Sequence, residues 1–239
     1  MLTSYIVVSR SHIVVVVVYL NLALNLNNIP QIWKLGKIVP ILKPNKNPCI
    51  GSSYRSISLV SPIAKTLEKV LLPYLTKNIP QSKHQDGYKA LHSTTTALHQ
   101  LTNKITHGLN QKPPLRIIVV SLDLSKASDT VNIHSLINEL HKTTVPNTII
   151  KLIANYTKDR KGFTQYQNSK SKSQQFKTGV PQGGVLSPIL FNVYTSDIPH
   201  PPSDVSLTAY ADDMIPVASH SKYHIAEQNL QPYLQDIFQ

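Results

Sequence analysis

Three aspartates stand where their carboxylates could act together in chemistry. Asp123 lies near the end of the apolar stretch 116–124, and Asp212 and Asp213 are adjacent between two further apolar segments. Neighbouring carboxylates make each other costlier to ionise, so a cation should compensate them. Carboxylates on strands of one sheet can hold two Mg²⁺ ions about 3.5–4 Å apart, an arrangement that promotes phosphoryl transfer. Because aspartate is also common in turns, the Asp212–Asp213 pair taken alone favours a structural role, and only its combination with Asp123 points to a metal site.

The charge balance is compatible with a polyanionic partner for such a site. The chain has 239 residues, enough for one large or two small domains, and 24 Lys and Arg against 12 Asp and Glu give a net charge of +12. This excess is either a solvated basic surface or a nucleic-acid-binding one. Cys49 is the only cysteine, which excludes a disulfide framework and a cysteine-based zinc site. A basic protein with an oxygen-only metal site points to nucleotide chemistry.

The elements that must position the aspartates read as strands. The stretch 116–124 is continuous and rich in β-branched residues, which predicts a strand covered on both faces. Segments 206–210 and 214–218 predict a hairpin with a very tight turn at the aspartate pair. Pro216 removes a backbone donor from the second strand, so we expect an edge or a bulge there. Segments 162–167 and 174–178 predict a second hairpin, whose polar tip, 168–173, is basic.

Helical spacing accounts for much of the rest. Serine followed by proline, at 61–62 and at 187–188, is typical of a helix start. Helices and strands alternate without a regular βαβ rhythm, which predicts an α+β fold. The predicted helices are one from Pro62 with apolar Ile63, Leu67, Val70, Leu71, Tyr74 and Leu75; one from Ser93 with Ala97, Leu98, Leu101 and Ile105; one within 146–158; one from Ser187; and one from Tyr223 with Ile225, Leu230, Leu234 and Phe238, interrupted by Pro232 and with an apolar face left without a partner.

The apolar run Ile13–Leu24 near the N-terminus contains five consecutive valines. Its twelve residues are fewer than the roughly 20 needed to span a bilayer. A signal peptide is an alternative because Arg10 precedes the run, but no small-residue cleavage site follows it. The run therefore predicts a buried strand or a strained helix of the core, with no stable membrane association.

Several motifs, in order, resemble one polymerase family. Residues 210–213, YADD, resemble the YxDD box of reverse transcriptases, and residues 179–188, GVPQGGVLSP, resemble their glycine-rich motif B. Residues 123–131, DLSKASDTV, resemble motif A with its leading aspartate. Fingers-region blocks of non-LTR, LINE-type elements, the jockey-like ones best, are matched by Ile29-Pro30, Trp33-Lys34, YRSISL at 54–59, KTLE at 65–68 and QDGYK at 85–89. The resemblance runs from about Ile29 to Ser219.

The resemblance implies the fingers and palm of a right-hand polymerase, with the chain truncated before the thumb. It places an apolar N-terminal segment at 1–28, fingers at 29–115 and palm at 116–239, the last two interleaved. Asp123, Asp212 and Asp213 would be the catalytic, metal-binding carboxylates, with Asp213 the least direct ligand. The implied cofactor is a pair of Mg²⁺ ions, or Mn²⁺ in their place.

The resemblance also implies nucleotide-binding residues. Arg55 would contact the incoming triphosphate, which suits the bidentate geometry of a guanidinium. Gln182 would line the nucleotide pocket, and Gly183 and Gly184 would allow close approach of the backbone. Ser128 stands where the family usually has an aromatic ring against the ribose 2′-OH, so selection between sugars is in question. Weaker candidates are Tyr210, which either abuts the primer end or closes the core face of its strand, and Lys43 and Lys46, which either meet phosphate or belong to a solvated loop.

The function implied is RNA-directed DNA polymerase, a reverse transcriptase with an RNA template, a DNA primer and dNTPs as partners. The element type suggests a nuclear or cytoplasmic location and fixes no oligomeric state. One alternative is an inactive, truncated remnant that at most binds nucleic acid through its basic surface. An RNA-dependent RNA polymerase shares the metal chemistry and would suit Ser128, but the motif order and the Pro-Gln-Gly sequence argue against it.

Overall fold

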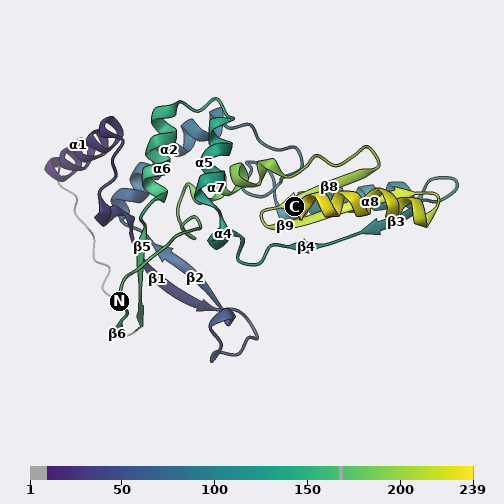
Figure 1. Ribbon diagram of the computed structural model, residues 1–239, viewed down its shortest axis with the longest axis horizontal. Coiled ribbons are helices and arrows are strands. Elements are labelled where there is room, and N and C mark those ends of the chain that lie inside the picture. Colours follow the sequence, from purple (N-terminus) through teal and green to yellow (C-terminus); the bar gives the residue numbers. More distant parts are fainter. Residues whose placement is uncertain (1–9, 167–168, 239) are drawn as a thin grey trace. The chain divides into compact units, whose positions relative to one another are not determined.

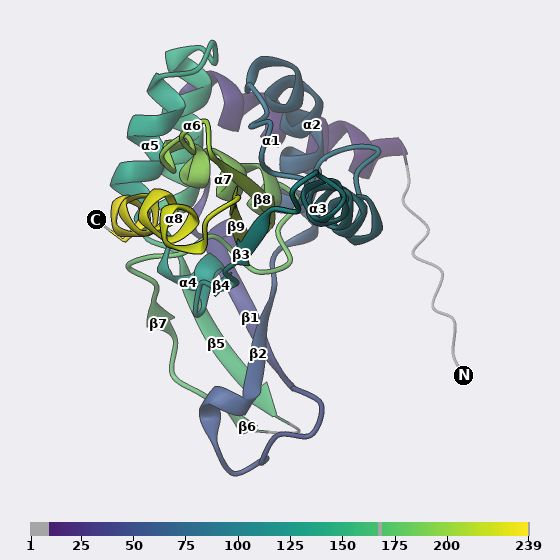
Figure 2. The same cartoon turned by 90° about the vertical axis from the view of Figure 1, so that its right-hand side faces the viewer.

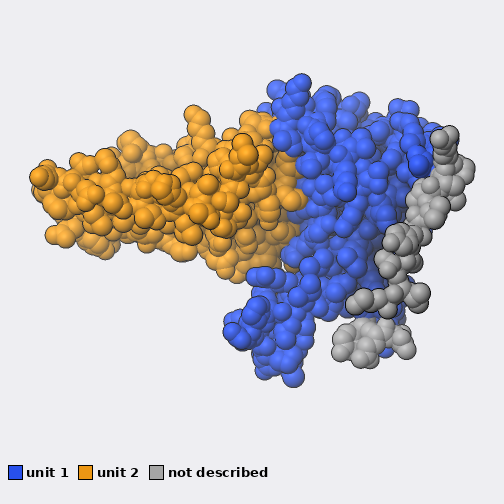
Figure 3. Space-filling view, turned by 180° about the vertical axis from the view of Figure 1, so that it is seen from behind, with its two compact units in different colours: residues 1–78, 132–187 blue, residues 79–131, 188–239 orange. Residues whose placement is uncertain are grey.

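A computed structural model of the chain describes residues 10–166 and 169–238. The chain forms two compact units, each built from two segments (Figure 3). Unit 1 comprises residues 1–78 and 132–187, and unit 2 comprises residues 79–131 and 188–239. Both units contain helices and a sheet, so the predicted α+β class is confirmed.

Unit 1 is built on a sheet with the strand order β2-β1-β5-β6, in which β7 also pairs with β5 (Figure 2). Strands β1 and β2 are antiparallel, and β1 and β5 run parallel. The strands are β1 (Leu35–Leu42), β2 (Tyr54–Leu59), β5 (Lys161–Tyr166), β6 (Ser169–Lys170) and β7 (Gln174–Gln175); the helices are α1 (Arg10–Leu26), α2 (Pro62–Asn78), α5 (Ile133–His141) and α6 (Asn147–Thr157), with 3-10 turns η1 (Gln31–Lys34) and η2 (Gly51–Ser53).

Helices α2 and α6 supply much of the core of unit 1. Helix α2 begins at Pro62, as predicted, and buries Leu67, Leu71 and Leu75 at a spacing of four residues. Full burial of each such side chain contributes about 1.5–3 kcal/mol. Two members of the predicted apolar face, Val70 and Tyr74, are exposed instead, because they lie to the sides of this stripe.

The N-terminal valine run forms helix α1 and is not part of the core. Val14 is 61% exposed, and only Leu20 and Ala23 of the described part of this helix are buried. The prediction of a core segment is wrong because consecutive residues point in all directions around a helix, which can bury only one stripe. None of the described helices is long and apolar enough to cross a membrane.

The basic hairpin of unit 1 has a shorter tip than predicted. Strand β5 pairs with β6 through Gln165 opposite Lys170, so the return strand begins inside the stretch expected to be the tip. The return strand is then interrupted and resumes as β7, with Gln174 opposite Gly162. The predicted strand end at residue 167 and the tip residue 168 lie outside the described residues.

Unit 2 is built on a sheet with β9 at its centre (Figure 1). Strand β8 pairs with one side of β9, and β3 and β4 pair with the other, all antiparallel. The strands are β3 (Arg116–Val119), β4 (Leu122–Asp123), β8 (Val205–Tyr210) and β9 (Asp213–His220); the helices are α3 (Thr94–Leu109), α4 (Ala127–Thr130), α7 (Ser187–Tyr194, in unit 2 from Pro188 onward) and α8 (Tyr223–Ile237), with the 3-10 turn η3 (Thr195–Asp197).

Helices cover both faces of this sheet. Ile118 packs against the cluster formed by α8 and the central strands, while a Cβ on Gly108 of α3 would lie 3.0 Å from the side chain of Ile117. Adjacent strand residues point to opposite faces, so α3 and α8 lie on opposite sides. Coverage on both faces was predicted correctly for Ile117 and Ile118. It fails at Val119, which is 44% exposed.

The predicted continuous strand 116–124 is broken into β3 and β4, and Pro216 supplies the reason. The Val120 N–H donates to the Pro216 carbonyl at 3.1 Å, so the backbone polar groups of residue 216 face Val120. Proline has no N–H to return the second bond of this pair. The expectation that Pro216 lies at an edge or bulge is wrong, since β9 is the central strand. The interruption falls in the neighbouring strand instead.

Helix α8 begins at Tyr223, as predicted, and continues through Pro232. Its residues Ala226, Leu230 and Tyr233 are buried with Val205 and Ala218 of the sheet, and Figure 1 shows the helix along β9. The prediction of an apolar face without a partner is therefore wrong. The partner strands β8 and β9 lie directly before the helix in the sequence, but helical spacing alone does not show which surface an apolar face packs against.

Candidate functional site

The acidic turn, residues 210–213, joins β8 to β9 in the tightest way that a hairpin allows. Tyr210 and Asp213 are paired across the two strands, which leaves Ala211 and Asp212 as a two-residue turn. Ala211 has a φ of 56°, and the turns that match the twist of paired strands require a positive φ at this position. The predicted hairpin and its tight turn are confirmed. Asp212 is half-buried and Asp213 is exposed.

Strand β4 places Asp123 directly opposite Asp213. Side chains so paired across antiparallel strands have Cβ atoms about 4.5–5.5 Å apart, and like charges there repel. Asp212 is the neighbour of Asp213 in the turn. The structure thus brings the three predicted aspartates together at one end of one sheet.

The proximity of the three carboxylates affects the pKa of Asp213. Desolvation raises the pKa of Asp213, and the charges of Asp212 and Asp123 raise it further. Within residues 10–166 and 169–238, no lysine, arginine or histidine forms an ion pair with any of these three carboxylates. Asp123, Asp212 and Asp213, the acidic cluster, thus have the uncompensated negative charge that attracts a cation.

The donor set of the acidic cluster fits a hard metal ion in chemistry, since it offers carboxylate oxygens. Across the described part of the chain, however, no group of three or more His, Cys, Asp or Glu side chains is arranged to hold a metal ion. The strand register brings Asp123, Asp212 and Asp213 within reach of one another, while ligation would require their side chains to turn toward a common point.

Tyr88 is a neighbour of the acidic turn that the sequence did not single out for a role. Burial raises the pKa of its hydroxyl, and the charge of Asp212 raises it further, followed by the effect of Tyr210. Tyr88 also has a φ of 60°, a left-handed conformation uncommon for a bulky residue. The signal was its place in the block QDGYK, which matched the family pattern.

In unit 1, the glycine loop, residues 179–186, meets the strand that carries Arg55. The Ser58 N–H of β2 donates to the Gln182 carbonyl at 2.7 Å. Gly183 has a φ of 100°, and a Cβ there would lie 3.1 Å from the Ser58 carbonyl oxygen, so both conformation and space favour glycine. Arg55 and Ser58 are three residues apart, about 10 Å along a strand. The predicted residues Arg55, Gln182 and Gly183 therefore belong to one region of unit 1.

A buried carboxylate, Glu68 of α2, holds the glycine loop. It is 1% exposed and accepts hydrogen bonds from the Val185 N–H at 2.5 Å and from the Tyr156 hydroxyl. Burial raises the pKa of Glu68 although both bonds oppose the shift. A Cβ on Gly184 would lie 3.1 Å from Glu68 Oε1, so the loop approaches closely there. Sequence reasoning matched the block KTLE at 65–68 but missed this role.

The remaining candidates are placed as follows. Ser128 lies half-buried in the short helix α4 of unit 2. Tyr210 is the last residue of β8, opposite Asp213. Lys43 and Lys46 lie in the segment between β1 and β2, where the Lys43 N–H donates to the Ser53 carbonyl.

The family follows from comparison with known proteins. Residues 41–238 match the family described as reverse transcriptase (RNA-dependent DNA polymerase). The chain belongs to the reverse transcriptase family. The predicted resemblance to jockey-like elements is confirmed by relatives from Drosophila melanogaster: the probable RNA-directed DNA polymerase from transposon BS, 32% identical over 90% of this chain, and the RNA-directed DNA polymerase from mobile element jockey, 31% identical over 92%. The chain spans about a quarter of the length of these relatives, 24% and 25%.

Solved structures agree in fold. The telomerase of Candida albicans superimposes with a TM-score of 0.58 at 12% identity, covering 87% of this chain and 42% of that one. The telomerase of Candida tropicalis gives a TM-score of 0.55 at 15% identity, covering 86% and 40%. Both were solved in complex with the TWJ fragment of telomeric RNA. The predicted polymerase fold of fingers and palm is confirmed, and reverse transcriptases generally use divalent metal ions.

Proposed function

We propose that this reverse transcriptase chain carries the carboxylates and nucleotide contacts for extending a DNA primer with dNTPs on an RNA template. The observation that carries the proposal is the register of unit 2, which sets Asp123 opposite Asp213 beside Asp212. In this proposal the three carboxylates hold two Mg²⁺ ions, or Mn²⁺, which supply Lewis-acid stabilisation of the reacting phosphate. The predicted division into fingers, 29–115, and palm, 116–239, is retained as part of the proposal.

The chain's own residues would divide the remaining work. Arg55, exposed on β2, would bind phosphate through its guanidinium, and the backbone at Gly183 would approach the nucleotide without a Cβ. Gln182 would line the nucleotide pocket, and Ser128 would border the ribose. A serine there leaves open the volume that an aromatic ring would fill, so we propose weak exclusion of ribonucleotides.

A primer-extension assay tests the catalytic proposal. The 239-residue chain is incubated with an RNA template, a DNA primer, dNTPs and Mg²⁺, beside Asp123→Asn and Asp212→Asn variants. Extension by the wild type that either substitution abolishes supports the metal role. Extension that persists in both variants would overturn the assignment of these residues. Asp204→Asn, at the exposed aspartate before β8, is the matched control and should retain activity.

A second candidate function, nucleic-acid binding without catalysis, is favoured by the net charge of +12. Lys170 and Lys172 are exposed on the basic hairpin, where Lys170 Nζ also lies 3.9 Å from the centre of the Phe163 ring. Phosphate contacts release counterions, so affinity should fall steeply with salt. Binding of RNA or DNA at several salt concentrations measures this slope. Strong binding with a steep slope but no extension would favour the non-catalytic alternative.

A further inference from the structure

A short segment of the chain adds to the free edge of β8, beside the acidic turn. The Asp86 N–H donates to the Ala209 carbonyl at 2.8 Å, and the Ala209 N–H donates to the His84 carbonyl at 2.7 Å. Gln85 thereby forms an isolated parallel bridge with Ala209. The backbone of residues 84–86 is thus hydrogen-bonded to Ala209, two residues before Ala211 in the acidic turn.

From this anchor, the Gln85 side chain reaches the turn itself. Its Oε1 accepts hydrogen bonds from the Ala211 N–H and the Gly87 N–H, both at 2.8 Å, and its Nε2 donates to the Ala211 carbonyl at 3.0 Å. Gln85 is 7% exposed, so water competes little for these bonds. One neutral amide therefore satisfies both backbone polar groups of the residue that begins the turn.

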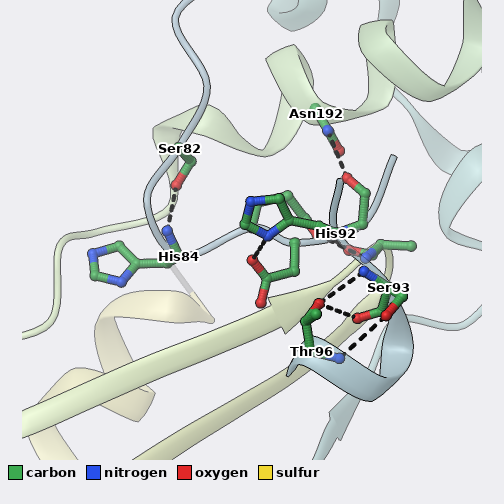
Figure 4. Close-up of polar contacts among 10 residues, drawn as sticks. Ser82, His84, His92, Ser93, Thr96 and Asn192 are labelled. Atoms are coloured by element: carbon green, nitrogen blue, oxygen red, sulfur yellow. Dashed lines mark hydrogen bonds and ion pairs between the residues drawn. The ribbon is translucent and has the colours of Figure 1, made fainter. Parts of the chain in front are cut away.

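The surrounding residues are shaped around this contact. A Cβ on Gly87 would lie 2.2 Å from the Ala211 nitrogen and 2.8 Å from Gln85 Oε1, so only glycine allows the approach. On its other side, Gly87 receives a hydrogen bond to its carbonyl from Asn192 Nδ2 of α7 at 3.0 Å (Figure 4). His92 pairs with the buried Asp86 at 2.5 Å and ties the same segment to the start of α3.

We propose that Gln85 is a positioning residue for the acidic turn, which it holds in the conformation that keeps Asp212 beside the Asp123–Asp213 pair. Ala211 has a φ of 56°, a left-handed conformation that is unfavourable for a residue with a Cβ. Without the amide, the backbone at Ala211 can leave its left-handed conformation, and this change would move Asp212. This inference rests on the proposed function, because the position of Asp212 matters there as a metal ligand.

Three variants separate hydrogen bonding from packing. Gln85→Met keeps the length of the side chain and removes all three bonds, while Gln85→Glu keeps the accepting oxygen. Gln231→Ala, at an exposed glutamine of α8, is the matched control. The first readout is amide hydrogen exchange at Ala211 in the 239-residue chain. Exchange should accelerate about 2- to 12-fold in the methionine variant, as expected for the loss of one hydrogen bond to the Ala211 N–H, and less in the glutamate variant, which keeps the acceptor for that N–H. Unchanged exchange in the methionine variant would overturn the proposal.

The second readout is Mn²⁺ affinity, measured by electron paramagnetic resonance without substrate. Loss of a residue that orients metal ligands typically costs about 10–100-fold in affinity, so Gln85→Met should bind Mn²⁺ more weakly by such a factor. Gln231→Ala should bind like the wild type. If wild-type binding depends on Asp123 and Asp212 but Gln85→Met binds equally tightly, the positioning role is overturned. If binding ignores both aspartates, the proposed metal site fails, and exchange at Ala211 still decides whether Gln85 holds the turn.

Discussion

The two loops that carry the candidate site residues are each held by one buried side chain, and the two side chains differ in character. In unit 1 the glycine loop is held by Glu68, a carboxylate that accepts hydrogen bonds from Val185 and Tyr156. In unit 2 the acidic turn is held by Gln85, a neutral amide that both accepts and donates.

The type of each holding side chain matches the hydrogen-bonding groups of its loop. The glycine loop, with the adjacent Tyr156, presents two donors, which a carboxylate can accept together. The acidic turn presents an N–H and a C=O of the same residue, Ala211, so its partner must contain both a donor and an acceptor. A carboxylate there would also add negative charge beside Asp212 and Asp213. The comparison implies that the hold on the glycine loop responds to pH, while the hold on the acidic turn does not.

Removal of Glu68 should produce the largest effect. Glu68→Ala leaves the buried Tyr156 hydroxyl and the partly buried Val185 N–H without an acceptor, at a cost of about 1–3 kcal/mol each. After the relief of burying a carboxylate is subtracted, we expect the free energy of unfolding of unit 1 to fall by about 2–4 kcal/mol. Urea denaturation followed by the fluorescence of Trp33, the single tryptophan and a buried residue of unit 1, measures this.

Glu68→Gln, which keeps one accepting oxygen, should lose less than half as much. Glu227→Ala, at an exposed glutamate of α8, should change the Trp33 transition little. A Glu68→Ala chain that unfolds at the wild-type urea concentration would show that the buried carboxylate does not hold the loop.

A smaller effect is expected from Gly87→Ala at the acidic turn. The added Cβ would lie 2.2 Å from the Ala211 nitrogen, a backbone atom that cannot swing aside. Overpacking of this kind costs about 1–3 kcal/mol. Hydrogen exchange of the β8–β9 hairpin, followed by mass spectrometry, should be faster by the factor to which this loss of free energy corresponds.

The control for Gly87 is Gly51→Ala, where an added Cβ meets nothing within 4 Å. Substitutions at such open positions usually change stability by less than about 0.5 kcal/mol. Equal behaviour of the two alanine variants would show that Gly87 does not approach the turn in solution.

The strand ends and helix starts behind these contacts could be predicted from the sequence, because their signals are local. Serine at 93 caps α3 through a reciprocal pair of bonds with Thr96, as a serine before an apolar periodicity predicts (Figure 4). Asp123 and the Asp212–Asp213 pair stood out because carboxylates are unusual at the ends of apolar strands. The family motifs then linked these separate local signals into one polymerase pattern.

The two holding side chains could not be predicted in the same way. Glu68 and Val185 are 117 residues apart, and Gln85 and Ala211 are 126 apart, so no local spacing connects them. The prediction that the valines of α1 are buried was wrong for a related reason. Their hydrophobicity alone predicts burial, but among the described residues no partner surface covers them. Where a long-range contact decides the outcome, composition and periodicity are insufficient.

The pH contrast can be tested with Glu68→Gln. Burial raises the pKa of Glu68 above its ordinary value of 4.5, so the folded chain keeps a proton that the unfolded chain releases. As pH rises from 4.5 through the raised pKa, the wild type should lose stability relative to the glutamine variant. The urea midpoint from Trp33 fluorescence, taken at several pH values, gives both curves. If the urea midpoints of the wild type and of Glu68→Gln change with pH in parallel, the titration of Glu68 does not affect the stability of unit 1. Gln85→Met, the control, should leave the pH dependence of unit 1 unchanged.

The smallest expected effect is a gain in stability from Ala211→Gly. Glycine adopts a φ of 56° without the penalty of about 1–2 kcal/mol that a Cβ brings, but it also widens the unfolded ensemble by about 0.4–1 kcal/mol. We therefore expect a net gain of about 0.5 kcal/mol, seen as slower exchange of the β8–β9 hairpin. Ala209→Gly, in the adjacent strand without a positive φ, should have the opposite sign. The decisive comparison combines Ala211→Gly with Gln85→Met. If the amide holds a strained turn, relief of the strain should reduce the cost of losing the amide, and the two changes will be non-additive. Strict additivity would mean that Gln85 and the strain at Ala211 act independently, so the amide would not be what keeps Ala211 in its left-handed conformation.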